Sequence, residues 1–268
     1  MLSMTDIAVI ILVGQDNVHI GRCLDRLAAL DPRQVFVVES QPADGTGDIA
    51  RQKGATTVFH QWPGIQSIQF NWAIDNLPIE AEWILRLDVD EYLTKDTIER
   101  IKVTLTQGLV DVSGVTLELR RKFCGGEIRH ATAGIRQVRL FRKGRARYAD
   151  SLMDERLDVD GEVADFDGAF YDDNLNSMDW WREKHRGYAK REAAQALAGT
   201  YPDPRKAKYY RLPPYFRAVA YFCLRYFLKG GFLDGYAGWM WNFWQGLWYR
   251  WIVDREIGRI KRSRKRCR

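Results

Sequence analysis

Apolar residues occur in short β-branched runs up to about residue 119, and a segment with helical spacing follows each run. The runs predict buried strands at 7–13, 34–40, 55–59 and 83–87. The helical spacing predicts helices at 17–30, 66–77 and 96–107, the last of them closed by Gly108. Strands joined by helices of this length predict an α/β fold with a mainly parallel sheet, flanked by helices on both faces.

The pattern changes after residue 110. Segments 112–123, 134–144 and 162–171 have the character of strands joined by loops, which predicts a mixed extension of the same sheet. A long helix is then predicted at 177–198, with Ser177 as its N-cap and Gly199 after its last turn.

The C-terminal third predicts an amphipathic helical extension. Residues 215–251 are dense in aromatic side chains, and their longest uncharged run has 15 residues, too short for a comfortable transmembrane helix. Trp and Tyr favour the membrane interface, so we expect two helices lying on the membrane, hinged at 229–231. The alternative is a helical hairpin packed on the rest of the chain or on a dimer partner. The predicted division is a catalytic domain at 1–205 and a membrane-associating segment at 206–268.

The net charge of +6 belongs to the tail. Residues 255–268 hold eight Arg or Lys and one Glu, whereas the rest of the chain holds 33 basic and 34 acidic residues. The tail suits anionic lipid, and the near-neutral body argues against a nucleic-acid partner. No oligomeric state is predicted.

Composition indicates a globular protein, with 46% hydrophobic and 28% charged residues. The four cysteines have no paired spacing, which fits a reducing compartment and gives no sign of a zinc site or a disulfide framework. The N-terminus lacks a basic region and a cleavage site, and is expected to be a first strand rather than a signal peptide. These features predict a cytoplasmic protein, peripheral on the inner face of the cell membrane.

Three carboxylates follow the predicted strand at 83–87, namely Asp88, Asp90 and Glu91. Like charges this close repel unless something positive lies among them. A D-x-D pair at a strand tip offers oxygen ligands to Mg2+ or Mn2+, which commonly takes one or two carboxylates plus substrate phosphates. The alternatives are a solvated acidic turn and an N-cap for the helix that begins near Asp96.

Four segments, taken together and in order, resemble an inverting family 2 glycosyltransferase with a GT-A-type fold. They read IAVIILVGQDNVHIGRCLDRL, VVESQPADGTGDIARQKGA, QFNWAIDNL and WILRLDVDEYL, and cover roughly residues 5–95. The long helix at 177–198 and the segment GFLDG resemble the branch that builds lipopolysaccharide cores and exopolysaccharides.

The resemblance implies a UDP-sugar site with Mn2+ or Mg2+ as cofactor. The implied nucleotide-sugar contacts are Val13, Glu39, Asp44, Asn71 and Asp88. Asp90 is the implied metal ligand, and Glu91 supports it. The chain departs from the family where Glu39 replaces the usual Asp, and where 14–16 read Gly-Gln-Asp instead of a sequence such as Asn-Glu.

An inverting transfer needs a general base for the acceptor hydroxyl. Where relatives carry a His-Glu pair, this chain reads YADSLMDERL, so Glu155 is the first candidate and Asp154 the second; the alternative is an acidic surface turn. Lys184 and His185 are placed near the phosphates, with solvated helix residues as the alternative. Arginines 136, 139 and 142 either meet phosphate or form a solvated face.

The predicted function is transfer of a sugar from a UDP-sugar to a lipid-linked, lipopolysaccharide or exopolysaccharide acceptor. The alternative is a non-catalytic nucleotide- or glycan-binding protein on the same fold, which the Glu39 departure and the missing His leave open.

Overall fold

The apolar runs of the N-terminal half form neighbouring parallel strands in the order β3-β2-β1-β4. These are β1 (Thr5–Val13), β2 (Pro32–Glu39), β3 (Thr56–Phe59) and β4 (Trp83–Asp88). The register pairs Val13 with Glu39 on one side of β1 and Leu12 with Asp88 on the other. Glu39 and Asp88 therefore reach the same carboxyl edge of the sheet.

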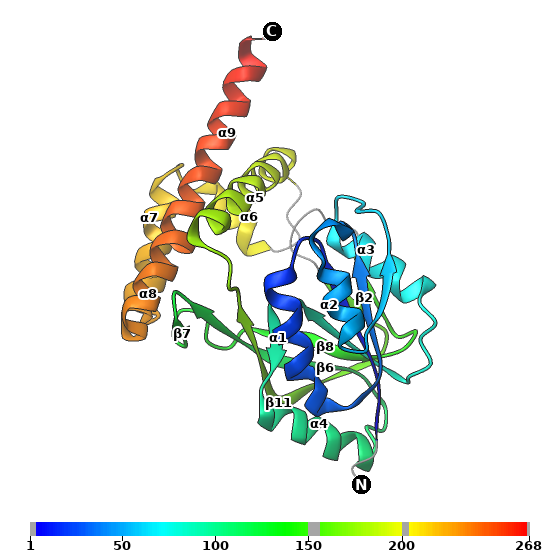
Figure 1. Cartoon of the computed structure of the whole chain (residues 1–268). Helices are drawn as coiled ribbons and strands as arrows, with labels where there is room; N and C mark the ends of the chain where they lie inside the picture. Colours follow the sequence, from blue (N-terminus) through cyan, green and yellow to red (C-terminus); the bar gives the residue numbers. More distant parts are fainter. Residues whose placement is uncertain (1–3, 150–155, 200–203, 267–268) are drawn as a thin grey trace. The chain divides into compact units, whose positions relative to one another are not determined.

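The computed structural model describes residues 4–149, 156–199 and 204–266, and Figure 1 traces the chain. The described residues divide into two compact units. The first unit comprises 4–120, 134–149 and 156–175, and the second comprises 121–133, 176–199 and 204–266. The predicted bases Asp154 and Glu155 lie outside the described residues.

Antiparallel strands extend the sheet beyond β4, in the order β8-β6-β11-β5. They are β8 (Arg136–Arg142), β6 (Val112–Phe123), β11 (Glu162–Asp173) and β5 (Glu91–Leu93). Short pieces complete the set, namely β7 (Gly126–Ile128), β9 (Ala146–Tyr148) and β10 (Leu157–Val159). The predicted mixed sheet is confirmed, but β5 was not predicted. It pairs with β11 and makes Glu91 a strand residue, with Asp172 as its partner.

Helices cover both faces of the sheet in the first unit. They are α1 (Asn17–Leu27), η1 (Ala28–Leu30), η2 (Pro42–Asp44), α2 (Thr46–Gln52), α3 (Gln66–Asn76) and α4 (Lys95–Gln107). The N-cap of α4 is Thr94, whose side chain accepts a hydrogen bond from the Thr97 amide. Asp88, Asp90 and Glu91 are therefore not the cap of this helix, which removes one of the alternatives for the acidic cluster.

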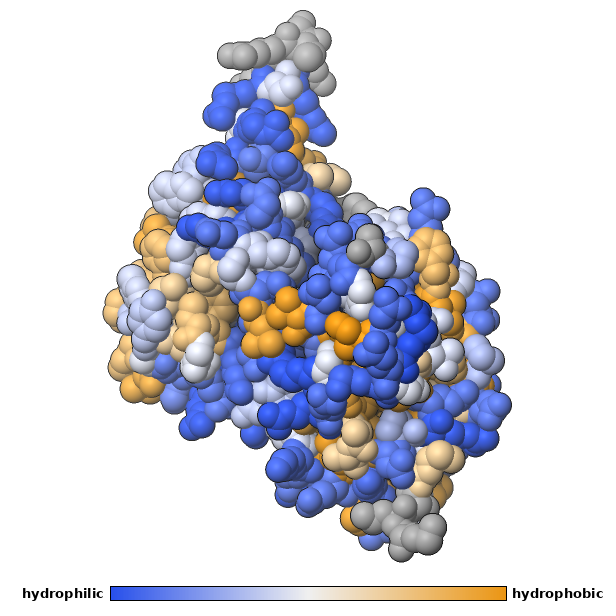
Figure 2. Space-filling view, in the orientation of Figure 1, coloured by the Kyte–Doolittle hydropathy of each residue, from blue (hydrophilic) through white to orange (hydrophobic). Residues whose placement is uncertain are grey.

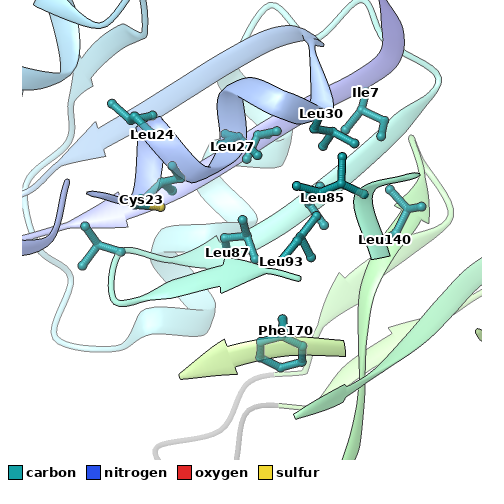
Figure 3. Packing of buried hydrophobic residues seen from close by; sticks show 14 of the residues in the cluster. Ile7, Cys23, Leu24, Leu27, Leu30, Leu85, Leu87, Leu93, Leu140 and Phe170 are labelled. Atoms are coloured by element: carbon teal, nitrogen blue, oxygen red, sulfur yellow. The ribbon is translucent and has the colours of Figure 1, made fainter. Parts of the chain in front are cut away.

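Alternate residues of each strand enter different cores, because successive side chains point to opposite faces. Leu85 and Leu87 of β4 pack with Leu24 and Leu27 of α1, as Figure 3 shows, in a cluster that α2 and α4 also line. Ile84 of β4 instead enters a second cluster with Phe70 of α3. The face of β4 that carries Ile84 also carries Arg86 and Asp88.

The second compact unit is helical apart from β7 and the end of β6. Its helices are α5 (Met178–Ala198), α6 (Pro204–Arg211), α7 (Phe216–Cys223), α8 (Gly235–Trp241) and α9 (Tyr249–Arg266). The Ser177 hydroxyl accepts from the Trp180 amide and Gly199 follows α5 in the left-handed conformation, as predicted. The predicted helical C-terminal extension is present.

Two π-helical segments continue helices in this unit, η3 (Leu224–Leu228) after α7 and η5 (Asn242–Trp248) after α8. Between η3 and the 3-10 turn η4 (Gly231–Asp234), Gly230 has a φ of 70°, which a residue without Cβ adopts readily. This turn falls at the hinge predicted for 229–231.

Charged side chains lie inside the second unit. Glu192 on α5 accepts hydrogen bonds from the hydroxyls of Tyr210 and Tyr249 and from Arg250. Arg217 forms a buried ion pair with Asp254, which also accepts from the Tyr215 amide. Because α5 and α9 share a core as well as this network, the helices form a unit with an interior of its own.

None of the helices in the part of the chain that the structure describes combines the length and the apolar character needed to span a bilayer.

Candidate functional site

The loops that leave β1 and β2 are joined by hydrogen bonds at the carboxyl edge of the sheet. Asp16 accepts from the Gly14 amide at 2.8 Å, and its own amide donates to the Thr46 hydroxyl at 3.1 Å. Ser40 donates to the Val13 carbonyl through both its amide and its hydroxyl, each at 3.0 Å. Val13 is therefore a buried residue whose carbonyl ties the two loops together.

Asp44 completes this connection. One carboxylate oxygen accepts from the amide and the hydroxyl of Thr46, at 3.1 and 2.7 Å, and the other accepts from the Asn17 amide at 3.2 Å. Partial burial raises the pKa of Asp44, but the hydrogen bonds from Thr46 and Asn17 outweigh it and leave the pKa below its ordinary value. Asp44 is thus held ionised at the rim.

Glu39 is buried against the start of α2. Its carboxylate lies 3.4 Å from Arg51 and directly over Gly47, where an added Cβ would be 2.0 Å from the Glu39 Oε1 atom. The longer reach of Glu compared with Asp brings the carboxylate onto this helix. Glycine at position 47 is what allows the approach.

Asp88 is held by two donors. Arg86, two residues earlier on the same face of β4, donates to Oδ1 at 3.2 Å. The side-chain Nε2 of Gln66 donates to the same oxygen at 3.1 Å. The Asp88 side chain is 33% exposed, whereas that of Arg86 is 7% exposed. The carboxylate therefore meets solvent at the edge, and its cationic partner lies inside.

Glu91 is the buried member of the acidic cluster. Arg139 on β8 donates to it at 2.5 Å, and the Asp88 amide donates to its other oxygen at 2.8 Å. Burial raises the pKa of Glu91 to about 8, with the negative charges of Asp88 and Asp90 adding to burial and the Arg139 guanidinium opposing it. Two guanidinium groups thus lie among the three carboxylates, so the protein itself supplies the positive charge that offsets their repulsion.

Asp90 contacts the end of β11. Asn174 donates to its carboxylate at 2.8 Å, and the Asp173 amide donates to its carbonyl at 3.0 Å. Asp173 is in turn paired with Arg22 of α1 at 2.9 Å. The tip of β4 is therefore closed by a segment that lies more than 80 residues later in the sequence.

Asn71 uses its amide inside the fold. Its Nδ2 donates to the Tyr148 carbonyl and its Oδ1 accepts from the Tyr148 amide, both at 2.9 Å, and the side chain is buried. Both ends of the side-chain amide are therefore used to fix β9 against α3, and the nucleotide contact of Asn71 stays a prediction.

The predicted residues reach one edge of the sheet but point to different sides of it. Glu39 contacts α2, whereas Asp88 contacts Gln66 at the start of α3. These helices pack on opposite faces of the sheet. The rim therefore presents Asp44, Asp88 and Asp90, while Glu39 and Glu91 are buried behind it.

A metal ion would find few protein ligands here. Among the described residues, no group of three or more Asp, Glu, His or Cys side chains is arranged to hold an ion. Mg2+ commonly takes one or two carboxylates and obtains its other ligands from phosphate and water. Asp90, with Asp88 beside it, fits that smaller donor set, and Glu91 does not because Arg139 and the Asp88 amide already occupy its oxygens.

Lys184 and His185 belong to the second unit. The Lys184 ammonium lies 4.6 Å from the centre of the Trp180 ring, and His185 stacks on Trp181 at 3.5 Å. Burial lowers the pKa of His185 to about 4, against the hydrogen bond to the Trp181 carbonyl. His185 is thus a neutral ring in an aromatic cluster, neither the exposed residue nor the phosphate-facing cation that the sequence suggested.

The three arginines of β8 do not form one solvated face. Arg139 is buried on Glu91, Arg142 donates to the carbonyls of Val112 and Leu109, and Arg136 pairs with Asp165. The sequence pattern also gave no prediction for Arg86, Gln66 and Asn174 as partners of the aspartates. A charged residue inside an otherwise apolar strand, as in WILRLD, was the available signal for Arg86.

No protein-family model matches the sequence, and a search of curated proteins found no match. Among solved structures, residues 1–349 of S. aureus TarS align with 15% identity and a TM-score of 0.45, over 99% of this chain and 92% of that one. The glucosyl-3-phosphoglycerate synthase of Mycobacterium tuberculosis, in complex with Mn2+, UDP and glucosyl-3-phosphoglycerate, aligns with 15% identity and a TM-score of 0.35.

That second match covers 44% of this chain and 45% of the synthase. A longer structure of S. aureus TarS aligns with a TM-score of 0.44 and 15% identity, over 89% of this chain and 48% of that one. The chain thus spans less than half the length of these two proteins. At this identity and TM-score the likeness shows no activity for this chain.

Gly47→Ala is expected to destabilise the first unit by about 1–3 kcal/mol, because the added methyl group would overlap the Glu39 carboxylate and force it off the helix. Gly21→Ala is the matched control, since it lies within α1 and an added Cβ there meets nothing closer than 3.6 Å. Thermal unfolding of both variants measures the difference. Equal melting temperatures for the two would show that Glu39 does not lie over Gly47.

The lowered pKa of His185 should make the stability of the protein depend on pH. Its pKa is about 4 in the folded protein and about 6.5 in the unfolded chain, so the unfolded state binds the proton first as the pH falls. The contribution is present above pH 6.5 and is lost progressively down to about pH 4, by about 1–3 kcal/mol in all. His185→Phe keeps the aromatic stacking and removes the titration.

Urea unfolding at several values between pH 8 and pH 5 tests this dependence. The wild type should lose more stability than His185→Phe over that range, while the two differ by a constant amount above pH 7. Parallel profiles throughout would mean that His185 keeps its ordinary pKa.

Proposed function

We propose that this protein is a metal-dependent inverting glycosyltransferase that uses a UDP-sugar. The observation that carries the proposal is the placement of Asp88 and Asp90 at the carboxyl edge of the parallel strands, the edge at which sheets of this class bind ligands. Two buried guanidinium groups support the tip from inside, with Arg86 on Asp88 and Arg139 on Glu91. The family resemblance of segments 7–27, 37–55, 69–77 and 83–93 supplies the reaction class.

In this proposal Asp90 holds Mn2+ or Mg2+, and Asp88 contacts the ribose or sugar of the donor. When bound, such a cation stabilises the negative charge that develops on the departing diphosphate. Asp44, kept ionised by Thr46 and Asn17, contacts the nucleoside. The buried position of Glu39 makes it a support for α2 next to that contact, and the buried Asn71 supports β9.

The transfer itself needs a base. The acceptor hydroxyl loses its proton to a carboxylate as its oxygen forms a bond to the anomeric carbon, and the bond from that carbon to the diphosphate oxygen breaks, which inverts the configuration. Glu155, with Asp154 as the second candidate, is proposed for this role. Both lie outside the described residues.

Titration calorimetry of UDP with and without Mn2+ tests the nucleotide site. The wild type should bind UDP more tightly with Mn2+, and Asp90→Asn should lose about tenfold or more of that metal-dependent affinity, because the amide is a much weaker ligand than the carboxylate. Asp96→Asn is the control, since it removes a nearby negative charge from the exposed first turn of α4.

Absence of UDP binding in both conditions would overturn the UDP assignment. Equal metal-dependent binding by the wild type and Asp90→Asn would instead remove Asp90 from the metal site.

We propose further that residues 206–268 attach the protein to the inner face of the cell membrane, where a lipid-linked, lipopolysaccharide or exopolysaccharide acceptor would be presented. An exposed apolar ridge supports this attachment. It consists of Leu224, Phe227, Leu228, Phe232, Leu233, Tyr236 and Trp239. In Figure 2, apolar side chains gather on the part of the surface where Figure 1 labels α7 and α8.

Ring contacts join parts of the ridge, and Lys229 lies at its turn. The Tyr226 ring lies 6.3 Å from that of Phe232 and 5.6 Å from that of Trp239. Lys229 is exposed at the turn of the ridge, and α9 carries further exposed basic side chains, including Arg259 and Arg262. Apolar and aromatic residues flanked by cations suit an anionic lipid interface.

Flotation with anionic vesicles measures this attachment. Leu228→Glu combined with Leu233→Glu should lower the bound fraction roughly tenfold, because two apolar side chains would no longer be transferred from water and two negative charges would face the lipid. Val110→Glu is the matched control, since Val110 is 78% exposed in the first unit and Leu228 is 81% exposed. Binding that survives the double change, or is lost equally in the control, would exclude the ridge as the lipid contact.

A further inference from the structure

Arg86 is a buried cation in the middle of a core strand. It lies on the face of β4 that also carries Ile84, and that face packs in the cluster of Phe70, Phe141 and Tyr148. Burying a guanidinium group in such a place is expensive, and replacing a whole buried ion pair by well-packed apolar residues of similar volume is often neutral or stabilising. Stability of the core therefore does not account for this residue.

The contacts of Arg86 define its geometry. The guanidinium lies 4.6 Å from the centre of the Tyr148 ring and 5.4 Å from that of Phe70, and it donates to the Tyr148 hydroxyl. With these contacts made, another nitrogen reaches Asp88 Oδ1 at 3.2 Å. The aromatic rings thus hold the guanidinium in a plane and direct one edge of it at the carboxylate.

The partner Tyr148 is itself fixed. Asn71 binds the amide and the carbonyl of Tyr148 at 2.9 Å each, which holds β9 on α3. The same helix supplies Gln66, whose side-chain Nε2 donates to Asp88 Oδ1 at 3.1 Å. A single helix, α3, therefore positions both of these donors to Asp88 Oδ1.

We propose that Arg86 is a positioning residue, which together with Gln66 fixes the rotation of the Asp88 carboxylate at the edge of the sheet where a nucleoside diphosphate binds. Two donors on one oxygen restrict rotation about the Cβ–Cγ bond, since any turn breaks both hydrogen bonds. The proposal rests on the proposed function for the identity of the ligand. The orientation of Asp88 itself is independent of it.

Arg86→Met separates positioning from structure. Met fills a similar volume and removes the charge, and the Asp88 carboxylate that loses its partner is 33% exposed and can be hydrated, so the variant should stay folded with a melting temperature a few degrees below that of the wild type. The Kd for UDP in the presence of Mn2+ should nevertheless increase about tenfold, the size of effect that follows loss of a supporting group behind a ligand-binding residue. Arg86→Lys keeps the charge but cannot span both Tyr148 and Asp88, and should recover only part of the affinity.

Arg142→Met is the matched control. Arg142 also lies over an aromatic ring, Trp83 at 4.7 Å, and also belongs to the sheet, but it contacts backbone carbonyls and Glu82 instead of Asp88. This variant should leave the Kd for UDP unchanged. A loss of affinity equal to that of Arg86→Met, or a Kd for Arg86→Met equal to the wild type, would overturn the proposal.

A crystal structure of Arg86→Met without nucleotide gives the second readout. The Asp88 carboxylate should rotate away from its wild-type orientation while the backbone of β4 stays in place. If the wild type fails to bind UDP, the proposed function fails, and this structure alone decides the role of Arg86. An Asp88 carboxylate that keeps its orientation in the variant would show that Arg86 does not position it.

Discussion

Two buried guanidinium groups make the acidic end of β4 compatible with a folded core. Arg139 meets Glu91 at 2.5 Å and Arg86 meets Asp88 at 3.2 Å, and both arginines are almost wholly removed from solvent. Leaving Arg139 buried without Glu91 would cost about 3–5 kcal/mol, because both of these side chains are buried. Arg139 reaches the cluster because β8 lies beside β4, to which it pairs in antiparallel orientation.

The same constraint divides the carboxylates into two kinds. Those that are buried, Glu91 and Glu39, are held by cations of the first unit and by close approach to backbone. Those at the rim, Asp44, Asp88 and Asp90, are less buried and accept hydrogen bonds from Thr46, Gln66 and Asn174. Hydrogen bonds from inside the fold restrict the rotation of a rim carboxylate before a ligand binds, which is what a preorganised site requires.

The second unit also buries charged side chains, and it exposes apolar side chains on its surface. Its interior holds the charges, with Glu192 among tyrosine hydroxyls and Arg250, and Asp254 on Arg217. Its outside carries the apolar ridge around the turn at Gly230. Charges inside give the helices defined partners, and apolar side chains outside provide a surface that water does not favour.

The local sequence pattern determined most of the secondary structure of this protein and pointed to two of its rim residues. Apolar runs placed β1 to β4, helical spacing and the caps Ser177 and Gly199 placed α5, and the D-x-D spacing by itself singled out Asp88 and Asp90. Only the tertiary structure decided what holds the acidic cluster, because Arg139, Asn174 and Tyr148 lie 48 to 84 residues from the partners that they contact. Likewise, the sequence does not indicate that Asn71 hydrogen-bonds to the backbone of Tyr148, or that His185 stacks on Trp181. Periodicity reports which face of an element is buried, whereas the partner that meets a buried polar group depends on how distant strands and helices pack.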